Sequence, residues 1–493
     1  MIAVADPARS STSALGERLA KLGVPLADLT TDSRLVKRGS VFVAYPGSAR
    51  DGRAYIADAI ARGAAAVIWE RRGFDWDARW AVPNLAIEDL RAAASDIAGI
   101  AYADPSASLW MVGVTGTNGK TSVAQWVAQA FDGLGRRAAV LGTLGNGMVG
   151  ERAEAKNTTP DPVVLQRELA DYLRRGAKVA SMEVSSHGLD QGRAAGIKFD
   201  VAVFTNLTRD HLDYHGTMEA YAQAKYRLFS ARGVGRAVIN VDDGWGGRFA
   251  DRLRGSPVDV IGYGLDGGRL RAGAVSQTEA GLRFRVEGDW GTGEVAAPVL
   301  GAFNVSNLLA VIGTLLASGV ALPAALAAVS KLKPVPGRLE RLGGGALPLA
   351  VIDYAHTPDA LEKALEAVRP VVAPGHRLLC VFGCGGERDA GKRPIMGEAA
   401  SRLADQVIVT SDNPRGEDPQ SIIEQVLAGV LSGHVEAVPD RQVAIFSAIH
   451  QARPGDVVLV AGKGHETYQE IAGVRHSFND AEAALAALEA WPR

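Results

Sequence analysis

The chain has 493 residues, of which 47% are hydrophobic, so it can form several buried cores, and its length predicts about three domains. Its 53 lysines and arginines nearly balance its 55 aspartates and glutamates, so no broad electric field attracts nucleic acid or an anionic membrane. The two cysteines, Cys380 and Cys384, are too few and too close together for a disulfide framework. We expect them to pack in a core within a reducing compartment.

Neither the N-terminus nor the interior predicts a targeting or membrane segment. Residues 1–6 lack a basic segment followed by an apolar run, and therefore no secretory signal is expected. The uncharged stretch 308–329 is long enough to span a bilayer, but Gly319 is typical of a helix terminator and Pro323 of the first turn of another helix. We therefore expect two short buried helices and a cytoplasmic protein.

Two segments with different patterns occupy the first two thirds of the chain. Residues 1–107 contain strand-like runs at 40–44 and 65–69 and a linker-like Asp-Pro-Ser at 104–106, so we expect a small α/β domain. In residues 108–336 apolar strands alternate with helical stretches, which predicts a mostly parallel sheet with helices on both faces. The strands expected in this second segment are 109–114, 138–142, 179–184, 201–205 and 237–241.

The remaining third of the chain predicts another α/β domain. The Gly- and Arg-rich segment 262–300 breaks the alternation, and we expect it to add short antiparallel strands. The sequence Lys-Pro-Val-Pro-Gly at 333–337 marks the next boundary, after which the alternation resumes over residues 337–493. This pattern predicts a doubly wound, Rossmann-like domain that binds ligands outside the carboxyl ends of its strands. Its expected strands are 350–353, 378–382, 407–410 and 457–461.

The most informative motif is the glycine-rich stretch 113–122, Gly-Val-Thr-Gly-Thr-Asn-Gly-Lys-Thr-Ser. It follows the predicted buried strand 109–114 and precedes a helix-permissive segment at 121–134. A glycine-rich turn between a strand and a helix is where proteins bind phosphate groups. The stretch therefore predicts a phosphate loop at the start of the second domain.

Individual residues of this stretch suit ATP. Gly116 and Gly119 let backbone amides converge on an anion at a helix N-terminus. Lys120 would neutralise phosphate charge, and the Thr121 hydroxyl would reach a magnesium ion. The chain has Val114 where the standard phosphate loop has its first glycine. A tight structural loop is therefore the alternative to ATP binding.

Polar residues near later strand ends are candidate metal ligands. Glu183 ends an apolar run, where a carboxylate is costly unless it is paired or bound to a metal, so magnesium binding and helix capping are the alternatives. His211 and His215 are four residues apart, a spacing that would let them share one metal on a helix. Zinc is not favoured, because the His-Glu-x-x-His order of zinc hydrolases is absent from the sequence.

Lys225 falls within an apolar stripe of the next predicted helix. A core-facing lysine must find a partner, extend to solvent or lose its charge. Two interpretations remain: a lysine that extends to solvent, or a neutral amine that captures carbon dioxide and becomes a carbamate ligand of the metal. The residues of the stripe are Tyr221, Ala224, Leu228 and Phe229.

Together these segments resemble the Mur ligases, which build the peptidoglycan precursor in the bacterial cytoplasm. The phosphate loop is followed in the family's order by Glu-Val-Ser-Ser-His-Gly-Leu-x-x-Gly-Arg at 183–193, Thr-Asn-Leu-x-x-Asp-His-Leu-Asp-x-His at 205–215, and Gly-Ala-Phe-Asn-Val-Ser-Asn-Leu-Leu-Ala at 301–310. The resemblance covers almost the whole chain and is greatest to the family members that add the third amino acid. Such enzymes use ATP to convert the carboxylate of a nucleotide-linked peptide into an acyl phosphate, and then join it to an amine.

The resemblance implies roles for the residues at matching positions. ATP would be bound by Gly116, Thr117, Asn118, Gly119, Lys120, Thr121, Ser122, Asn304, Arg338 and Asp353. The catalytic residues would be Lys120, Glu183, His211 and Lys225, and Mg²⁺ would be held by Thr121, Glu183, His211 and carbamylated Lys225. The muramoyl-dipeptide would be held by Asn157, Thr158, Thr159, Ser185, Gln191 and Arg193. The uridine nucleotide would be held by Thr31, Ser33, Ser48, Ala49 and Arg50, the last three in Gly-Ser-Ala-Arg-Asp-Gly, where the family has Gly-His-Gln-Ala-Asp-Gly.

The third domain carries a motif that bears on the incoming amino acid. Asp412-Asn413-Pro414-Arg415 resembles the motif of Mur ligases that select meso-diaminopimelate. This amino acid has an extra carboxylate at its far end, which an arginine can bind through two parallel hydrogen bonds, whereas lysine would present an ammonium there. In isolation the motif would be interpreted as a turn that caps a helix. Further matching contacts to this substrate are Arg388, Gly462 and Glu466.

The implied activity is ATP-dependent addition of meso-diaminopimelate to UDP-N-acetylmuramoyl-L-alanyl-D-glutamate. We expect a monomer that acts on these small molecules, with neither nucleic acid nor membrane as a partner. Three different functions remain open: the same ligation with L-lysine, a folylpolyglutamate synthetase-like ligase, and a non-catalytic nucleotide switch.

Overall fold

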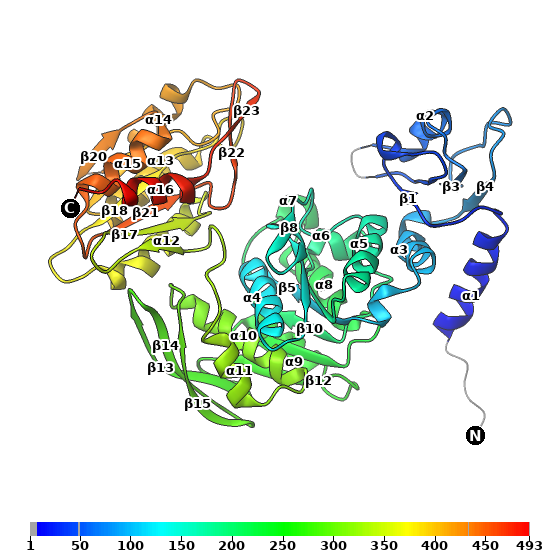
Figure 1. The fold of residues 1–493 in the computed structure, drawn as a ribbon, viewed down its shortest axis with the longest axis horizontal. Helices are drawn as coiled ribbons and strands as arrows, with labels where there is room; N and C mark the ends of the chain where they lie inside the picture. The colour runs from blue at the N-terminus through cyan, green and yellow to red at the C-terminus, as the bar shows by residue number, and fades with distance from the viewer. Residues whose placement is uncertain (1–6, 48–49, 432, 493) are drawn as a thin grey trace. The chain divides into compact units, whose positions relative to one another are not determined.

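The computed structural model describes residues 7–47, 50–431 and 433–492 (Figure 1). The chain divides into two compact units. The first unit contains the residues up to Tyr263, together with Gly267–Arg269 and Gly313–Val320. The second unit contains Gly264–Asp266, Leu270–Ile312 and the residues from Ala321 onward. Ser48 and Ala49, two residues assigned to the uridine site, lie outside the described part of the chain.

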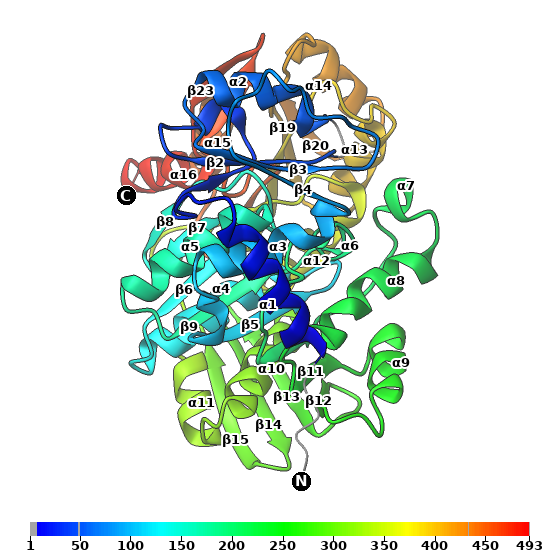
Figure 2. The ribbon, with the colours of Figure 1, turned by 90° about the vertical axis from the view of Figure 1, so that its right-hand side faces the viewer.

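The first unit begins with a small parallel sheet of order β1-β2-β3-β4. The central strands β2 and β3 are buried along their whole length, as expected for a parallel sheet with both faces covered. Helices α1 and α3 lie on one face of this sheet and α2 on the other (Figure 2). Side chains of α1 and α3 contribute to the core on the first face, and those of α2 to the core on the second. The elements are α1 (Pro7–Ala20), β1 (Leu29–Thr30), β2 (Val41–Ala44), α2 (Ile56–Ala61), β3 (Ala66–Glu70), β4 (Asn84–Ile87) and α3 (Leu90–Ala101). The two predicted strands are confirmed within one residue.

A larger sheet follows, of order β12-β11-β10-β5-β9-β6-β7-β8 within the first unit. The strands from β12 to β6 are parallel, whereas β7 and β8 are antiparallel additions that the sequence did not predict. The strands are β5 (Trp110–Thr115), β6 (Ala138–Gly142), β7 (Gly145–Met148), β8 (Glu151–Ala153), β9 (Val179–Glu183), β10 (Val201–Phe204), β11 (Arg236–Asn240) and β12 (Asp259–Gly264). The helices are α4 (Lys120–Gly133), α5 (Pro162–Arg174), α6 (Ser186–Asp190), α7 (Leu212–His215), α8 (Met218–Tyr226) and α9 (Gly244–Arg252).

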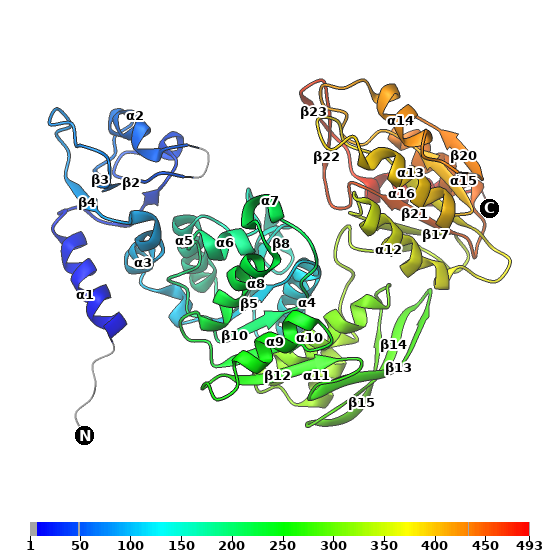
Figure 3. The same ribbon diagram turned by 180° about the vertical axis from the view of Figure 1, so that it is seen from behind.

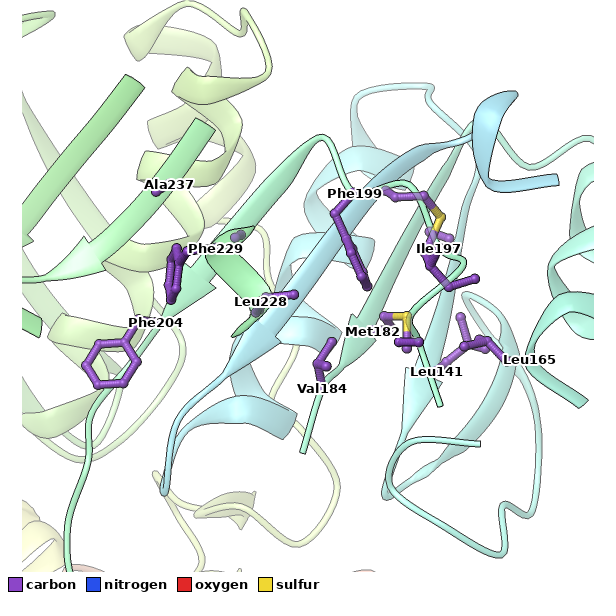
Figure 4. Close-up of a cluster of buried hydrophobic side chains, with 14 of the residues drawn as sticks. Leu141, Leu165, Met182, Val184, Ile197, Phe199, Phe204, Leu228, Phe229 and Ala237 are labelled. Atoms are coloured by element: carbon purple, nitrogen blue, oxygen red, sulfur yellow. The ribbon is translucent and has the colours of Figure 1, made fainter. Parts of the chain in front are cut away.

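Figure 4 shows part of the core beside this sheet. Phe199, Phe204 and Leu228 are each fully buried, and a buried side chain of this size contributes about 1.5–3 kcal/mol to the free energy of unfolding. Gly113 in β5 leaves room for this packing, because a Cβ there would lie 2.9 Å from the Phe199 ring. The core therefore fixes β5, the strand that leads into the glycine-rich stretch.

The second unit begins with three antiparallel strands, which confirms the prediction for 262–300. They are β13 (Leu270–Thr278), β14 (Gly281–Gly288) and β15 (Gly291–Ala297). Two helices follow along the chain: α10 (Phe303–Ala317), whose residues from Gly313 onward belong to the first unit, and α11 (Leu322–Val329). Gly319, at φ 80°, separates them, and Pro323 lies in the first turn of α11. Among the described residues, no helix is long and apolar enough to cross a membrane.

The rest of the second unit forms a sheet of order β16-β17-β21-β18-β19-β20, in which every pairing except β16 with β17 is parallel. Side chains alternate between its two cores: Cys380 and Phe382 of β18 pack on one face, Leu379 and Val381 on the other. Helices α12, α13 and α14 cover the first face, and α15 and α16 cover the second (Figures 1 and 3). Both cysteines are free and buried.

The four predicted strands are confirmed within one residue as β17, β18, β19 and β21, whereas β16 and β20 were not predicted. The strands are β16 (Glu340–Gly343), β17 (Leu349–Asp353), β18 (Leu378–Phe382), β19 (Gln406–Val409), β20 (His434–Ala437) and β21 (Val457–Ala461). The helices are α12 (Pro358–Val368), α13 (Lys392–Leu403), α14 (Pro419–Leu427), α15 (Arg441–Gln451) and α16 (Asp480–Glu489). A separate hairpin, β22 (Tyr468–Ile471) with β23 (Val474–Ser477), was not predicted.

Candidate active site

The glycine-rich stretch joins β5 to the N-terminus of α4, which confirms the predicted strand-loop-helix order. Gly116 lies at φ 153°, and a Cβ there would come within 1.9 Å of the Thr205 hydroxyl oxygen, so no larger residue fits. Gly119, at φ 83°, is the N-cap of α4. The residue that follows β10 is hydrogen-bonded to this loop: Thr205 Oγ1 donates to the Asn118 carbonyl at 2.6 Å. The N-terminus of a helix is the end at which backbone amides and the helix dipole favour an anion.

Two lysine side chains converge on one carbonyl of this loop. Lys120 Nζ donates to the carbonyls of Gly116 at 3.0 Å and Thr117 at 2.8 Å. Lys225 Nζ, on α8, donates to the same Gly116 carbonyl at 2.6 Å and lies 4.5 Å from the centre of the Tyr221 ring. Burial, and secondarily the nearby Lys120 charge, holds the pKa of Lys225 well below its usual value. The structure thus contradicts the interpretation in which Lys225 extends to solvent, because the residue is 1% exposed.

Glu183, the last residue of β9, lies beside the start of α4. Its Oε2 accepts from Thr121 Oγ1 at 2.8 Å, and its Oε1 accepts from the Thr143 amide at 2.7 Å. The carboxylate is buried, and no lysine or arginine pairs with it in the described part of the chain. A hydroxyl and a carboxylate oxygen side by side next to a phosphate loop are ligands of the kind that Mg²⁺ takes, with water and phosphate completing its shell. These residues therefore fit a magnesium ion.

The histidines lie in an aromatic cluster near α6 and α7. His187 is in ring contact with His211 at 4.9 Å and with His215 at 5.5 Å between centroids. His211 has a left-handed backbone, φ 51°, and precedes α7, so the two histidines do not lie on one helix as the spacing suggested. Burial lowers the pKa of His187 and of His215. Among the described residues, no group of three or more His, Cys, Asp or Glu side chains could hold a metal by itself.

Residues assigned to the dipeptide gather beside Glu183. Thr159 Oγ1 donates to the Glu183 carbonyl at 3.0 Å and accepts from the Ser185 amide at 2.9 Å. Arg193 Nη1 donates to the Thr159 carbonyl at 2.9 Å, and its Nη2 donates to Gln191 Oε1 at 2.6 Å. Thr158 is in hydroxyl contact with Thr143 at 3.1 Å. Asn157 lies exposed in the same segment.

The uridine-side residues lie in the first sheet's loops. Ser33 is buried in a short 3₁₀ helix after β1, Thr31 lies two residues before it, and Arg50 is exposed. Sequence reasoning missed Tyr45, whose hydroxyl donates to Asp161 Oδ2 at 3.0 Å, just after the dipeptide residues Thr158 and Thr159. Burial raises the pKa of the Asp161 carboxyl. A lone tyrosine after a strand carries no signal of such a long-range contact.

Residues assigned to ATP outside the phosphate loop belong to the second unit. Asp353, at the end of β17, accepts from the amides of Leu339 at 2.8 Å and Ala355 at 2.9 Å, and burial raises its pKa. The Arg338 guanidinium lies 4.9 Å from the centre of the Tyr354 ring, and its buried Nε has no hydrogen-bond partner among the described residues. Asn304, at the start of α10, donates to the Leu300 carbonyl at 2.7 Å.

The residues assigned to the incoming amino acid form what we call the acceptor frame, segments 412–415 and 462–466. Lys463, fully buried, donates to Asn413 Oδ1 at 3.0 Å and to Glu466 Oε2 at 2.9 Å. Asn413 Nδ2 donates to the same Glu466 oxygen at 2.9 Å. The frame therefore joins the loop after β19 to the loop after β21, and Lys463 is a member that sequence reasoning missed.

Arg415 is the half-buried outer end of this frame. Its backbone is left-handed, φ 51°, and its amide donates to the Glu470 carbonyl of β22 at 3.0 Å. Its Nη1 donates to the Gly386 carbonyl at 2.7 Å, which leaves further guanidinium donors for a carboxylate. Strained backbone at a non-glycine residue is common where a side chain must be aimed at a ligand. Arg388 is exposed on the same loop as Gly386, and Pro414 is buried next to Arg415.

Gly462 and Asp412 meet at the base of the frame. Gly462 lies at φ 119°, and a Cβ there would come 2.5 Å from Asp412 Oδ2, so only glycine allows the two loops to approach. Asp412 is buried, and desolvation raises its pKa against the opposing effect of Arg441 and Lys463. The folded chain therefore brings Asp412, Asn413 and Arg415 close to Gly462 and Glu466.

Comparison with known proteins identifies the family. Family models match the chain at residues 26–102 (Mur ligase family, catalytic domain), 114–315 (Mur ligase middle domain) and 337–464 (Mur ligase, glutamate ligase domain). The chain belongs to the Mur ligase family. Its structure is an α/β protein with mostly parallel sheets and the three-domain architecture of Mur ligases.

Relatives extend the match over almost the whole length of this Mur ligase. UDP-N-acetylmuramoyl-L-alanyl-D-glutamate–2,6-diaminopimelate ligase of Chromobacterium violaceum is 52% identical, over 96% of each chain. The enzyme with the same name from Pseudomonas aeruginosa is 51% identical, over 94% of this chain and 96% of its own. A solved structure with that name is 39% identical, with a TM-score of 0.71 over 94% of this chain and 95% of the other.

Proposed function

We propose that this Mur ligase adds meso-diaminopimelate to the D-glutamyl carboxylate of UDP-N-acetylmuramoyl-L-alanyl-D-glutamate at the expense of ATP. The observation that carries the proposal is the 52% identity, over 96% of both chains, to a ligase with that name. The acceptor frame supports it independently, because Arg415 has guanidinium donors for a second carboxylate. Ligation of L-lysine, a folylpolyglutamate synthetase-like activity and a non-catalytic nucleotide switch lack such support.

The chemistry explains why ATP is needed. A carboxylate does not react with an amine at neutral pH, because oxide is a very poor leaving group. The carboxylate oxygen first takes the γ-phosphoryl group and ADP leaves; the amine nitrogen then bonds to the acyl carbon as the bond to phosphate breaks. The amine loses a proton, and phosphate departs. Two anions must meet in the first step, which requires local positive charge.

The phosphate loop supplies that charge in the proposed mechanism. The α4 amides and Lys120 would hold the phosphates of ATP, and Thr121 and Glu183 would hold Mg²⁺ with His211. When bound, Mg²⁺ would offset the charge of the phosphoryl oxygens. Thr158, Thr159 and Arg193 would keep the dipeptide carboxylate beside this charge. The 2.8 Å contact between Thr121 and Glu183 supports the pairing of these two as ligands.

We also propose that Lys225 carries a carbamate. A neutral amine, not an ammonium, adds to carbon dioxide, and the lowered pKa of Lys225 favours the neutral form. Addition of carbon dioxide to this amine, with loss of one N–H proton to solvent, would place a carboxylate-like anion near Gly116 that could bind the metal. Without carbon dioxide, a neutral Lys225 amine would share the Gly116 carbonyl with the Lys120 ammonium.

Domain organisation and setting complete the proposal. We assign the nucleotide-dipeptide to residues 1–107, ATP to 108–336 and the amino acid to 337–493, with Asn304, Arg338 and Asp353 as further ATP contacts. Thr31, Ser33 and Arg50 would contact the uridine nucleotide. The enzyme would act as a monomer in the cytoplasm, with neither nucleic acid nor membrane as partner. Water must be kept from the acyl phosphate, which favours closure of the domains.

Phosphate release tests this function directly. The full-length protein should release phosphate only when ATP, Mg²⁺, the nucleotide-dipeptide and meso-diaminopimelate are all present, and chelation of Mg²⁺ should stop release. ATP binding without substrate-dependent turnover would support a nucleotide switch and overturn the proposal. Turnover with a folate in place of the nucleotide-dipeptide would indicate a folylpolyglutamate synthetase-like ligase instead.

A further inference from the structure

A fully buried ion pair lies beneath the acceptor frame. Arg441, the first residue of α15, and Asp480, the first residue of α16, are both 0% exposed at their side chains. The pairing is bidentate: Arg441 Nε donates to Asp480 Oδ1, and Nη2 donates to Oδ2, each at 2.7 Å. Two parallel bonds fix the plane of the guanidinium. The remaining donors of Arg441 therefore point in set directions.

Those donors bond to the chain at the ends of two strands. Nη2 donates to the carbonyl of Ala461, the last residue of β21, at 2.9 Å. Nη1 donates to the carbonyl of Ser411, two residues after the end of β19, at 3.4 Å. Strand β18 lies between β19 and β21 in the sheet, so no ladder hydrogen bond joins these two strands. Arg441 is a side-chain link between them.

The two linked carbonyls immediately precede the two segments of the acceptor frame. Ser411 is followed by Asp412 to Arg415, and Ala461 is followed by Gly462 to Glu466. Further along the two segments, Lys463 connects them by donating to Asn413 of the first segment and Glu466 of the second. Arg441 therefore fixes the base from which both segments start, and Lys463 fixes their separation further along.

We propose that Arg441 and Asp480 are positioning residues for the incoming amino acid, a role that rests on the proposed function. Arg441 sets the spacing of the two frame segments, and Asp480 holds the Arg441 guanidinium in the plane that reaches both carbonyls. Arg415 and Glu466 reach the substrate in register only when that spacing is kept. A displacement of about 1 Å in a substrate-holding segment can cost about 100-fold in rate.

The same sheet offers a matched control. Arg377 and Asp456 precede β18 and β21, and therefore lie at the opposite ends of the strands, away from the frame. Arg377 Nη2 donates to Asp456 Oδ2 at 3.0 Å, and the Asp456 side chain is 2% exposed. Asp456 also accepts from the Arg377 amide at 2.8 Å. This pair lies at the starts of two strands that pair directly with each other, the Arg377 side chain is 40% exposed, and no acceptor residue adjoins it.

The test compares Arg441→Lys, Asp480→Asn and the control Asp456→Asn in the full-length protein. Arg441→Lys keeps a cation beside Asp480, which guards against a variant that fails to fold. Its single amino group cannot reproduce the guanidinium's bonds to both carbonyls. We expect the KM for meso-diaminopimelate to rise about 10- to 100-fold in both frame variants, with the KM values for ATP and the nucleotide-dipeptide changed less than about twofold. Asp456→Asn should lower the melting temperature without changing any KM.

The outcomes separate this inference from the proposed function. If the wild-type protein does not use meso-diaminopimelate, the proposed function fails. If the wild type does but Arg441→Lys and Asp480→Asn keep its KM for that amino acid, the positioning role is overturned. Equal changes in all three KM values, or the same KM change in Asp456→Asn, would show that the pair serves only stability, which also overturns it.

Discussion

Lys225 and Lys463 are both almost fully buried, at 1% and 0% exposed, but their Nζ atoms meet different partners. Lys463 Nζ bonds to the Glu466 carboxylate and to Asn413, so its charge is balanced inside the acceptor frame. Lys225 Nζ meets the Gly116 carbonyl and the face of Tyr221, and no carboxylate pairs with it within the described ranges. The charge of Lys463 is offset by Glu466, whereas Lys225 lies near the positive charge of Lys120.

This difference separates two uses of a buried charge. A paired charge costs desolvation but holds neighbouring groups in one geometry, which suits a frame that must recognise a substrate. An amine without a carboxylate partner destabilises the fold, and evolution retains such a group where chemistry needs it. We therefore expect changes at the phosphate loop to affect turnover, and changes at the frame to affect affinity for the amino acid.

The largest effect is expected at Lys225. Lys225→Ala should lower kcat about 10³-fold, because it removes the proposed carbamate ligand next to the phosphate loop. Small carboxylates such as formate should partly restore the rate, since they would supply the missing anion. Steady-state phosphate release measures both effects. A near-wild-type rate for the variant, or no rescue together with no carbamate mass on the wild-type lysine, would contradict the carbamate.

Arg415 should show the opposite pattern. Arg415→Ala removes the guanidinium proposed to bind the far carboxylate, and the KM for meso-diaminopimelate should rise about 10²-fold, as expected for loss of one side of a charged hydrogen-bonded pair. The KM for ATP should stay within about twofold, because Arg415 lies outside the phosphate loop. Kinetics with each substrate varied in turn would check this. An equal loss for ATP and the amino acid would refute the role of Arg415.

Replacing each of the two buried lysines by methionine should change the free energy of unfolding in opposite directions. Lys463→Met should lower the free energy of unfolding by about 1–3 kcal/mol, because Glu466 loses its charged partner and Asn413 loses one of its donors. Lys225→Met should raise it at pH 7 in buffer free of carbon dioxide. The unfolded wild type binds a proton at Lys225 below about pH 10.5 while the folded state resists it, so wild-type stability rises with pH up to that value.

The gain from Lys225→Met should therefore shrink as the pH is raised from 7 to 9. Urea unfolding at each pH would measure the gain. If Lys225→Met destabilises the protein at pH 7, or if the gain grows with pH, Lys225 is a paired and charged residue and the contrast with Lys463 fails.

The smallest effect is expected at Tyr45. Tyr45→Phe removes one hydrogen bond to the buried Asp161 and should cost about 1 kcal/mol of stability. Because Asp161 follows the dipeptide residues, the KM for the nucleotide-dipeptide should rise a few-fold, and that for meso-diaminopimelate should not change. A change confined to the amino acid would contradict this placement.

Much of the fold could be predicted because it depends on local pattern. The apolar runs at β5, β18 and β21 appear in the sequence as continuous buried strands, and their bounds agree within one residue. Gly319 and Pro323 likewise separated α10 from α11. The short strands β7 and β8 and the hairpin of β22 and β23 were missed, because their pairing depends on contacts with other parts of the chain.

The candidate site likewise has parts that the sequence predicts and parts that only the folded structure shows. The phosphate loop was predicted because its glycines carry a local conformational signal, φ 153° at Gly116 and φ 83° at Gly119. The position of His211 was not predicted. Its left-handed backbone places it before the start of α7, so it does not lie on the same helix as His215. Arg441 and Asp480 are 39 residues apart and give no local signal, so only the folded structure shows that they meet.

The most direct test of the account is the product made from UDP-N-acetylmuramoyl-L-alanyl-D-glutamate and ATP when meso-diaminopimelate and L-lysine compete at equal concentration. Mass spectrometry should find a nucleotide-tripeptide that contains diaminopimelate, with little or no lysine product. A predominantly lysine-containing tripeptide would contradict the role of the acceptor frame, and no ligated product with either amino acid would contradict the ligase itself.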